Sequence, residues 1–147
     1  MGTVTQRRWS VAGCLAVYAA ASLFIGRHVL AHVSTVIAND LGDPIFTTAI
    51  LHWIGHHVPY TDAWYQLPIF HPSRDALTFS EHLLGIAVVA TPIEWLTGSA
   101  VVAYNITLVL SFALCAAAMF ALVLRLTRSV PAAFIAGLAY GFAPYRI

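Results

Sequence analysis

With 147 residues, of which 60% are hydrophobic and only 9% charged, the chain is far from soluble domains, where about a quarter of residues are charged. This composition argues against a soluble fold and predicts an all-α, polytopic transmembrane helical bundle. The net charge of +1, carried by scattered arginines, argues against a nucleic-acid-binding surface, so we expect no nucleic-acid partner.

The first apolar run covers residues 9–25 and follows Arg7 and Arg8. Its length lies near the lower limit of about 17 residues for a membrane span. A positively charged start and a cluster of alanines at residues 19–21 would also suit a cleaved signal peptide. We predict that residues 9–25 form a retained first span, with the signal peptide as the alternative.

The connection that follows, residues 26–82, holds all seven histidines and five of the six acidic residues. Titratable groups between apolar runs are typical of membrane proteins that present chemistry at the water interface. Arg7 and Arg8 favour a cytoplasmic N-terminus, which makes this connection an outer loop. Arg125 and Arg128 oppose that orientation, because they would then also lie outside. We predict an outer loop.

A short amphipathic helix is predicted over residues 45–57 of this loop. Asp43 and Pro44 precede it, and Asp43 could cap a helix whose first residue is Pro44. Apolar residues recur at helical spacing on one side, whereas Thr48 and Gly55 belong to the other side. Together with the nearby aromatic residues, this pattern predicts a helix that lies in the membrane interface.

Two histidines of this helix, His52 and His56, are four residues apart and could share a metal ion, and His57 follows directly. No general base in a His-Glu-x-x-His pattern accompanies them, and their spacing fixes no third ligand. Structural or interfacial histidines are therefore the favoured interpretation. We predict no metal site and no cofactor. A divalent metal is possible but lacks support.

The rest of the outer loop, residues 59–80, contains three prolines and follows neither a helical nor a strand period. Its aromatic residues argue against disorder. Because a long loop that is ordered is usually functional, we predict an ordered, functional loop.

Three further apolar runs are predicted as spans. Residues 83–96 make a short second span, with a tilted helix or one lying partly in the interface as the alternatives. It ends near Glu94, which we expect at water as a helix-end residue rather than as an intramembrane proton carrier. Residues 101–124 are uncharged and exceed the roughly 30 Å of a bilayer core, so they form the third span. Residues 130–145 form the fourth. Small residues recur there every fourth position and offer a smooth strip for close helix contact: Ala133, Gly137 and Gly141.

The order of these parts resembles the N-terminal part of bacterial integral-membrane proteins of the GT-C glycosyltransferase superfamily, including YfhO-like and protein-mannosyltransferase-like relatives. The resemblance covers nearly the whole chain from Asp40 onward. It depends on the first span, the Gly-Asp-Pro turn and the tryptophan-bearing helix, followed by short motifs at residues 69–72, 80–85, 103–105 and 142–146.

The resemblance implies a transferase that moves a sugar from a polyprenyl-phosphate donor to an acceptor at the outer face of the cytoplasmic (inner) membrane. It implies an essential acidic residue after the first span, which corresponds best to Asp43 and next to Asp40. A carboxylate there can act as general base toward an acceptor hydroxyl; a purely capping role is the alternative. Arg74, Glu81 and His82 are candidates for binding the donor phosphate, since an arginine fork matches phosphate oxygens. A plain interfacial charge is the alternative for Arg74.

Proteins of the resembled kind continue with further spans, so residues 1–147 are expected to be one membrane domain of a longer enzyme, inactive as an isolated fragment. A second class of function also fits the sequence. In that class the chain is a small non-enzymatic membrane protein, such as a transporter subunit or assembly factor, whose interfacial loop binds membrane lipid or a protein partner.

Overall fold

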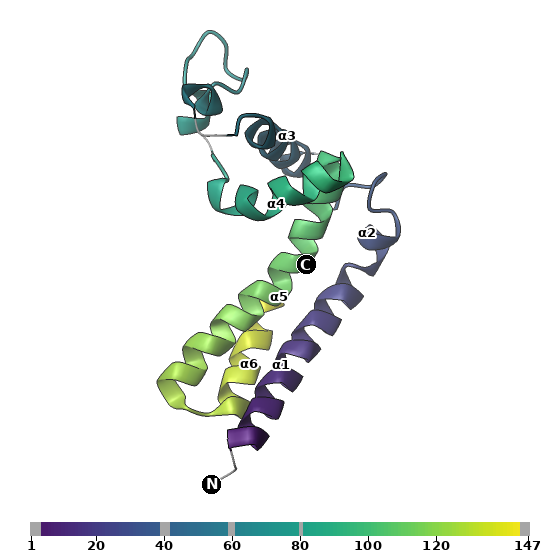
Figure 1. Ribbon diagram of the computed structural model, residues 1–147, viewed down its shortest axis with the longest axis vertical. Coiled ribbons are helices and arrows are strands. Elements are labelled where there is room, and N and C mark those ends of the chain that lie inside the picture. Colours follow the sequence, from purple (N-terminus) through teal and green to yellow (C-terminus); the bar gives the residue numbers. More distant parts are fainter. Residues whose placement is uncertain (1–3, 39–41, 59–60, 80, 145–147) are drawn as a thin grey trace. The chain divides into compact units, whose positions relative to one another are not determined.

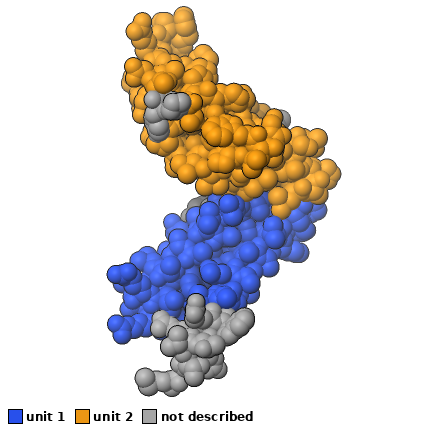
Figure 2. Space-filling view, viewed as in Figure 1, with its two compact units in different colours: residues 1–28, 108–147 blue, residues 29–107 orange. Residues whose placement is uncertain are grey.

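The computed structural model describes residues 4–38, 42–58, 61–79 and 81–144. In these residues the chain forms six α-helices, two short 3-10 helices and no β-strand, which confirms the all-α prediction. The chain divides into two compact units (Figure 2). Unit 1 is Met1–His28 with Leu108–Ile147, and unit 2 is Val29–Thr107.

The main helices follow the apolar runs of the sequence (Figure 1). In chain order they are α1 (Val4–Ile25), α2 (Arg27–Ala31), α3 (Asp43–His56), α4 (Leu84–Thr97), α5 (Ala100–Thr127) and α6 (Val130–Gly141). Two 3-10 helices, η1 (Asp62–Tyr65) and η2 (Ala76–Thr78), lie in the predicted ordered loop. The short helix α2 was not predicted, because five residues are too few to show a period.

Of the described helices, only α5 is long and apolar enough to cross a membrane. Its 28 residues contain the predicted third span. The apolar part of α1 and the whole of α4 and α6 are shorter. The 14 residues of α4 rise about 21 Å, against roughly 30 Å of hydrocarbon core. Length and composition therefore support one membrane-spanning helix.

The core of unit 1 forms around Tyr18 of α1, which is 1% exposed. Its hydroxyl donates to the Phe134 carbonyl at 2.9 Å, and its ring stacks on the Phe134 ring with centroids 5.6 Å apart. Ala116 and Phe120 of α5 and Ala133 of α6 complete the buried cluster. This cluster joins α1, α5 and α6.

The small residues of α6 lie where unit 1 packs most closely. Ala133 is fully buried, and Gly137 and Gly141 are also buried. A Cβ atom on Gly141 would lie only 2.9 Å from the Ala116 backbone nitrogen. The structure thus confirms that this strip permits close helix contact.

Unit 2 is organised partly by one amide, that of Asn105 near the start of α5. Its side-chain oxygen accepts from the Ala38 N–H at 3.2 Å, and its nitrogen donates to the carbonyls of Val33 at 2.9 Å and Val36 at 2.6 Å. Asn105 has no exposed surface. The backbone groups that follow α2 therefore find their partners on α5.

We expect Asn105→Ala to lower the free energy of unfolding by about 2–3 kcal/mol, because it leaves buried backbone groups without partners. Thermal unfolding of the purified chain in detergent measures this. Thr107→Val on the same helix is the matched control. In the described part of the chain, the buried Thr107 hydroxyl has no hydrogen-bond partner, so its loss should be neutral or stabilising. An equal decrease in the free energy of unfolding for Asn105→Ala and Thr107→Val would contradict the role of Asn105.

The start of α3 differs from the prediction in its cap. Gly42, not Asp43, is the N-cap residue, and no side chain there makes a capping hydrogen bond. Asp43 is the first helical residue and is exposed, with Pro44 directly after it. The capping role proposed for Asp43 is therefore wrong.

The buried face of α3 agrees only in part with the predicted apolar side, of which Ile50 and Ile54 are buried. Thr48 and Gly55, expected on the polar side, are buried, whereas Ile45 is 45% exposed. Thr48 tolerates burial because its hydroxyl donates to the Pro44 carbonyl at 2.8 Å. The buried face of α3 therefore combines these small residues with large apolar ones, and Gly55 lies against Glu94 of α4.

Candidate functional site

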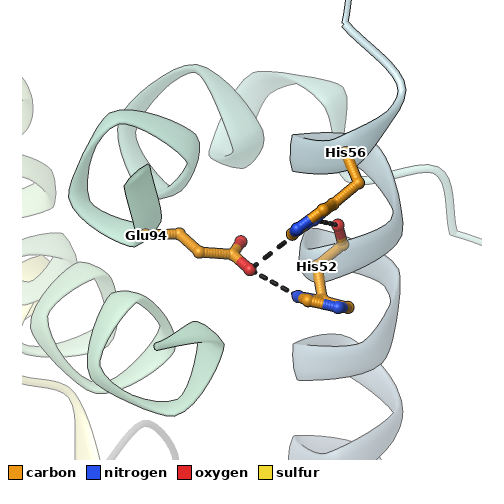
Figure 3. Close-up of side chains that lie close together, drawn as sticks. All are labelled: His52, His56 and Glu94. Atoms are coloured by element: carbon orange, nitrogen blue, oxygen red, sulfur yellow. Dashed lines mark hydrogen bonds and ion pairs between the residues drawn. The ribbon is translucent and has the colours of Figure 1, made fainter. Parts of the chain in front are cut away.

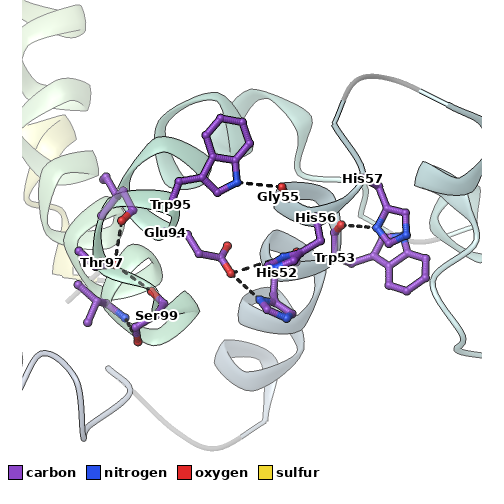
Figure 4. A network of polar contacts seen from close by, with 11 residues as sticks. His52, Trp53, Gly55, His56, His57, Glu94, Trp95, Thr97 and Ser99 are labelled. Carbon is purple, nitrogen blue, oxygen red and sulfur yellow. Dashed lines mark hydrogen bonds and ion pairs between the residues drawn. The ribbon is translucent and has the colours of Figure 1, made fainter.

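The site is built where α3 packs against α4 within unit 2. The indole N–H of Trp95 donates to the Gly55 carbonyl at 3.0 Å and so connects the two helices (Figure 4). A Cβ atom on Gly55 would lie 3.0 Å from a carboxylate oxygen of Glu94. Gly55 thus leaves the space in which Glu94 reaches α3.

Three titratable side chains meet at this contact: His52 and His56 from α3 and Glu94 from α4 (Figure 3). Their possible ligand atoms all lie within 4.8 Å of one another. Glu94 Oε1 pairs with His52 Nδ1 and lies 3.9 Å from His56 Nδ1. A four-residue separation on one helix places both imidazoles on the same face. The arrangement brings two imidazole rings and a carboxylate together. Because His56 Nδ1 donates to the His52 carbonyl, the lone pair that His56 can offer a metal is on Nε2.

Glu94 is only 4% exposed, although the sequence placed it at water as a helix-end residue. That prediction is wrong, because the packing of α4 on α3 covers its side chain. A buried carboxylate is costly unless it is paired. His52 supplies the pairing for Oε1, whereas Oε2 has no hydrogen-bond partner in the part of the chain that the structure describes.

The two histidines differ from Glu94 in being open to solvent, since each side chain is 56% exposed. His56 Nδ1 lies 2.9 Å from the His52 carbonyl oxygen, to which its N–H donates. The ring centroids of His52 and His56 are 4.2 Å apart. The cluster therefore has one buried carboxyl group and two accessible imidazoles.

His57 lies outside this cluster. Its Nδ1 donates to the Trp53 carbonyl at 2.7 Å, and its ring stacks on the Trp53 indole with centroids 3.9 Å apart. The same indole N–H donates to the carbonyls of Ala63 and Trp64, which fixes η1 against α3. His57, which follows the last residue of α3, is thus held on the face that η1 covers.

An apolar groove of about 220 Å³ lies on that face, between α3, η1 and α4. It is lined by Ile54, His57, Val58, Trp64, Leu84, Ala87, Val88, Thr91, Pro92 and Trp95. Only His57 and Thr91 bring polar groups other than the two indoles. Such a lining suits a hydrocarbon chain.

The residues predicted as the site are not brought together. Asp43 is exposed at the start of α3, and Asp40 lies outside the described residues. Arg74 and Glu81 are exposed in the loop, and His82 lines a small cavity beside Trp64, Tyr65 and Leu77. Among the described residues, no hydrogen bond or ion pair joins Asp43 to the other three.

Sequence reasoning missed Glu94 as a partner of the histidines, because 38 positions separate it from His56. One signal was present. An acidic residue within an apolar run needs a partner, and the nearest histidine pair at helical spacing was a candidate for that role. Comparison with protein-family models, with curated proteins and with solved structures finds no match.

Proposed function

We propose that this chain is the N-terminal part of a membrane glycosyltransferase. The enzyme would move a sugar from a polyprenyl-phosphate donor to an acceptor at the outer face of the cytoplasmic membrane. The observation that carries the proposal is the apolar groove on α3 and α4, since a polyprenyl-linked donor needs a surface for its hydrocarbon chain.

The surroundings of the groove support this use. Trp64 and Trp95 line it, and aromatic residues with one polar edge favour the headgroup level of a membrane. Asp43 begins the same helix and is exposed, as a general base must be to meet an acceptor hydroxyl. Arg74, Glu81 and His82 remain candidates for the donor phosphate.

The proposed membrane arrangement uses α5 as a full span and lets the shorter apolar helices α1, α4 and α6 contact the hydrocarbon core. Helices shorter than the hydrocarbon core are accommodated by local thinning of the bilayer or by partial insertion. In this arrangement α3 lies at the outer interface and α4 enters the membrane beside it.

The groove is tested with a photoactivatable polyprenyl phosphate in membranes that contain the protein. We expect Val88→Asp to reduce crosslinking about tenfold, because it adds a charge to an exposed position of the groove. Ile86→Asp is the matched control, since Ile86 is exposed on α4 outside the groove. Equal labelling of both variants and of the unchanged chain would sink the donor-binding role.

The non-enzymatic alternative uses the same groove for membrane lipid alone. It is favoured by the dispersal of the predicted site residues, which the described structure does not gather around Asp43. Groove-dependent crosslinking without sugar transfer by the intact protein would support this second function.

A further inference from the structure

We propose that His52, His56 and Glu94 bind one divalent transition-metal ion of the zinc class. The site would have three protein ligands and an open coordination position toward solvent. This inference does not rest on the proposed glycosyl transfer, because it concerns a different cluster of side chains and has its own measurement.

The first support is the convergence of donors. Zinc holds imidazole nitrogens and carboxylate oxygens at about 2.0–2.2 Å, which separates neighbouring ligand atoms by about 3.4 Å in a tetrahedral site. The donor atoms of the three side chains all lie within 4.8 Å of one another. His52 and His56 are both exposed, so their rings have room to adjust toward that spacing.

The second support is the hydrogen bond that the His56 ring makes to the backbone. Its Nδ1 donates to the His52 carbonyl at 2.9 Å, which fixes the tautomer and leaves the Nε2 lone pair available. Metal-binding histidines commonly donate their other ring N–H to a backbone carbonyl in this way, and the hydrogen bond orients the ring.

The third support is Glu94. A simple ion pair with His52 accounts for Oε1. It leaves Oε2 buried without a hydrogen-bond partner among the described residues, and it gives His56 no direct role. A bound cation would compensate the buried carboxylate more fully than one imidazole does, and it would use both histidines.

The donor set also indicates the class of ion. Calcium and magnesium prefer sites made wholly of oxygen, whereas two imidazoles and one carboxylate suit zinc and its neighbours. Two histidines and one glutamate with an open position form a ligand set found in catalytic zinc sites.

The test uses the whole chain, purified in detergent with an affinity tag that contains no histidine and stripped with a chelator. Zn²⁺ alone is titrated against a chromophoric competitor. We expect one ion per chain with a dissociation constant of micromolar order or tighter. His52→Ala and His56→Ala should each weaken binding at least about tenfold, on the scale of effects seen when metal-site residues are removed.

Glu94→Gln removes the carboxylate charge while keeping the shape, and it should weaken zinc binding by about 10–100-fold. If Glu94→Gln does not fold, Gly55→Ala tests whether the Glu94 carboxylate binds zinc. The Cβ atom of the new alanine would displace that carboxylate. The matched control is His71→Ala, an exposed loop histidine outside the cluster, which should bind zinc as the unchanged chain does.

A second readout is thermal unfolding with and without Zn²⁺, because a ligand that binds the folded state raises the unfolding temperature. The shift should vanish in the His52→Ala, His56→Ala double variant and persist in His71→Ala. The proposal is overturned if the double variant keeps the affinity and the shift, or if the unchanged chain binds no zinc at about 100 μM.

Discussion

Asp43→Asn is expected to lower sugar transfer by about 10²–10⁴-fold in the intact protein while expression and membrane insertion stay unchanged. The amide keeps the size of the side chain but cannot accept a proton from the acceptor hydroxyl, and general-base catalysis contributes an effect of that size. The structure places Asp43 on the first turn of α3, exposed and without a capping hydrogen bond. Its replacement should therefore leave the fold intact.

The measurement is transfer from a labelled polyprenyl-phosphate sugar in membranes, with Asp62→Asn as the control. Asp62 is an exposed carboxylate in the same loop, at the start of η1, and has no assigned role. Unchanged turnover in Asp43→Asn would remove Asp43 as the base. Equal loss in both variants would indicate a general requirement for negative charge in the loop.

Gly137→Leu should have the largest effect on stability, a loss of about 3 kcal/mol or more in the free energy of unfolding. A Cβ atom at this position would overlap the Tyr18 hydroxyl and lie 2.8 Å from the Ala116 carbonyl oxygen. The carbonyl belongs to the α5 backbone, so the side chain fits only if α6 moves away from α1 and α5. Overpacking of this kind typically costs 1–3 kcal/mol, and backbone separation adds to it.

Thermal unfolding of the purified chain in detergent, checked by limited proteolysis, measures this loss. Gly13→Leu is the matched control, because a Cβ atom on Gly13 meets nothing within 4 Å. The control should be neutral or slightly stabilising, since leucine favours helix more than glycine does. Similar unfolding temperatures for the two variants would show that α6 does not pack closely in solution.

The two proposed centres lie at opposite ends of α3. Asp43 and His52 are nine positions apart, so a rise of about 1.5 Å per residue separates them by about 13.5 Å along the axis. The ion at His52, His56 and Glu94 therefore would not activate the nucleophile beside Asp43. Loss of zinc binding and loss of sugar transfer can be measured independently, and neither result decides the other.

Local pattern was sufficient to predict most helices. Apolar runs predicted α1, α4, α5 and α6, and helical spacing predicted α3 to within two residues at its start. These features depend on neighbours three or four positions away, which the sequence shows directly. The strip of small residues on α6 was predictable for the same reason.

Contacts between distant segments could not be read from the sequence in this way. The partner of Glu94 comes from α3, and the partners of Asn105 come from the segment after α2. Which side of α3 is buried also depended on α4, because Gly55 leaves the space that the Glu94 carboxylate occupies. By itself the sequence determined the all-α class and one span-length apolar helix. Only the tertiary structure decided which polar groups meet, because burial and pairing depend on segments brought together by folding.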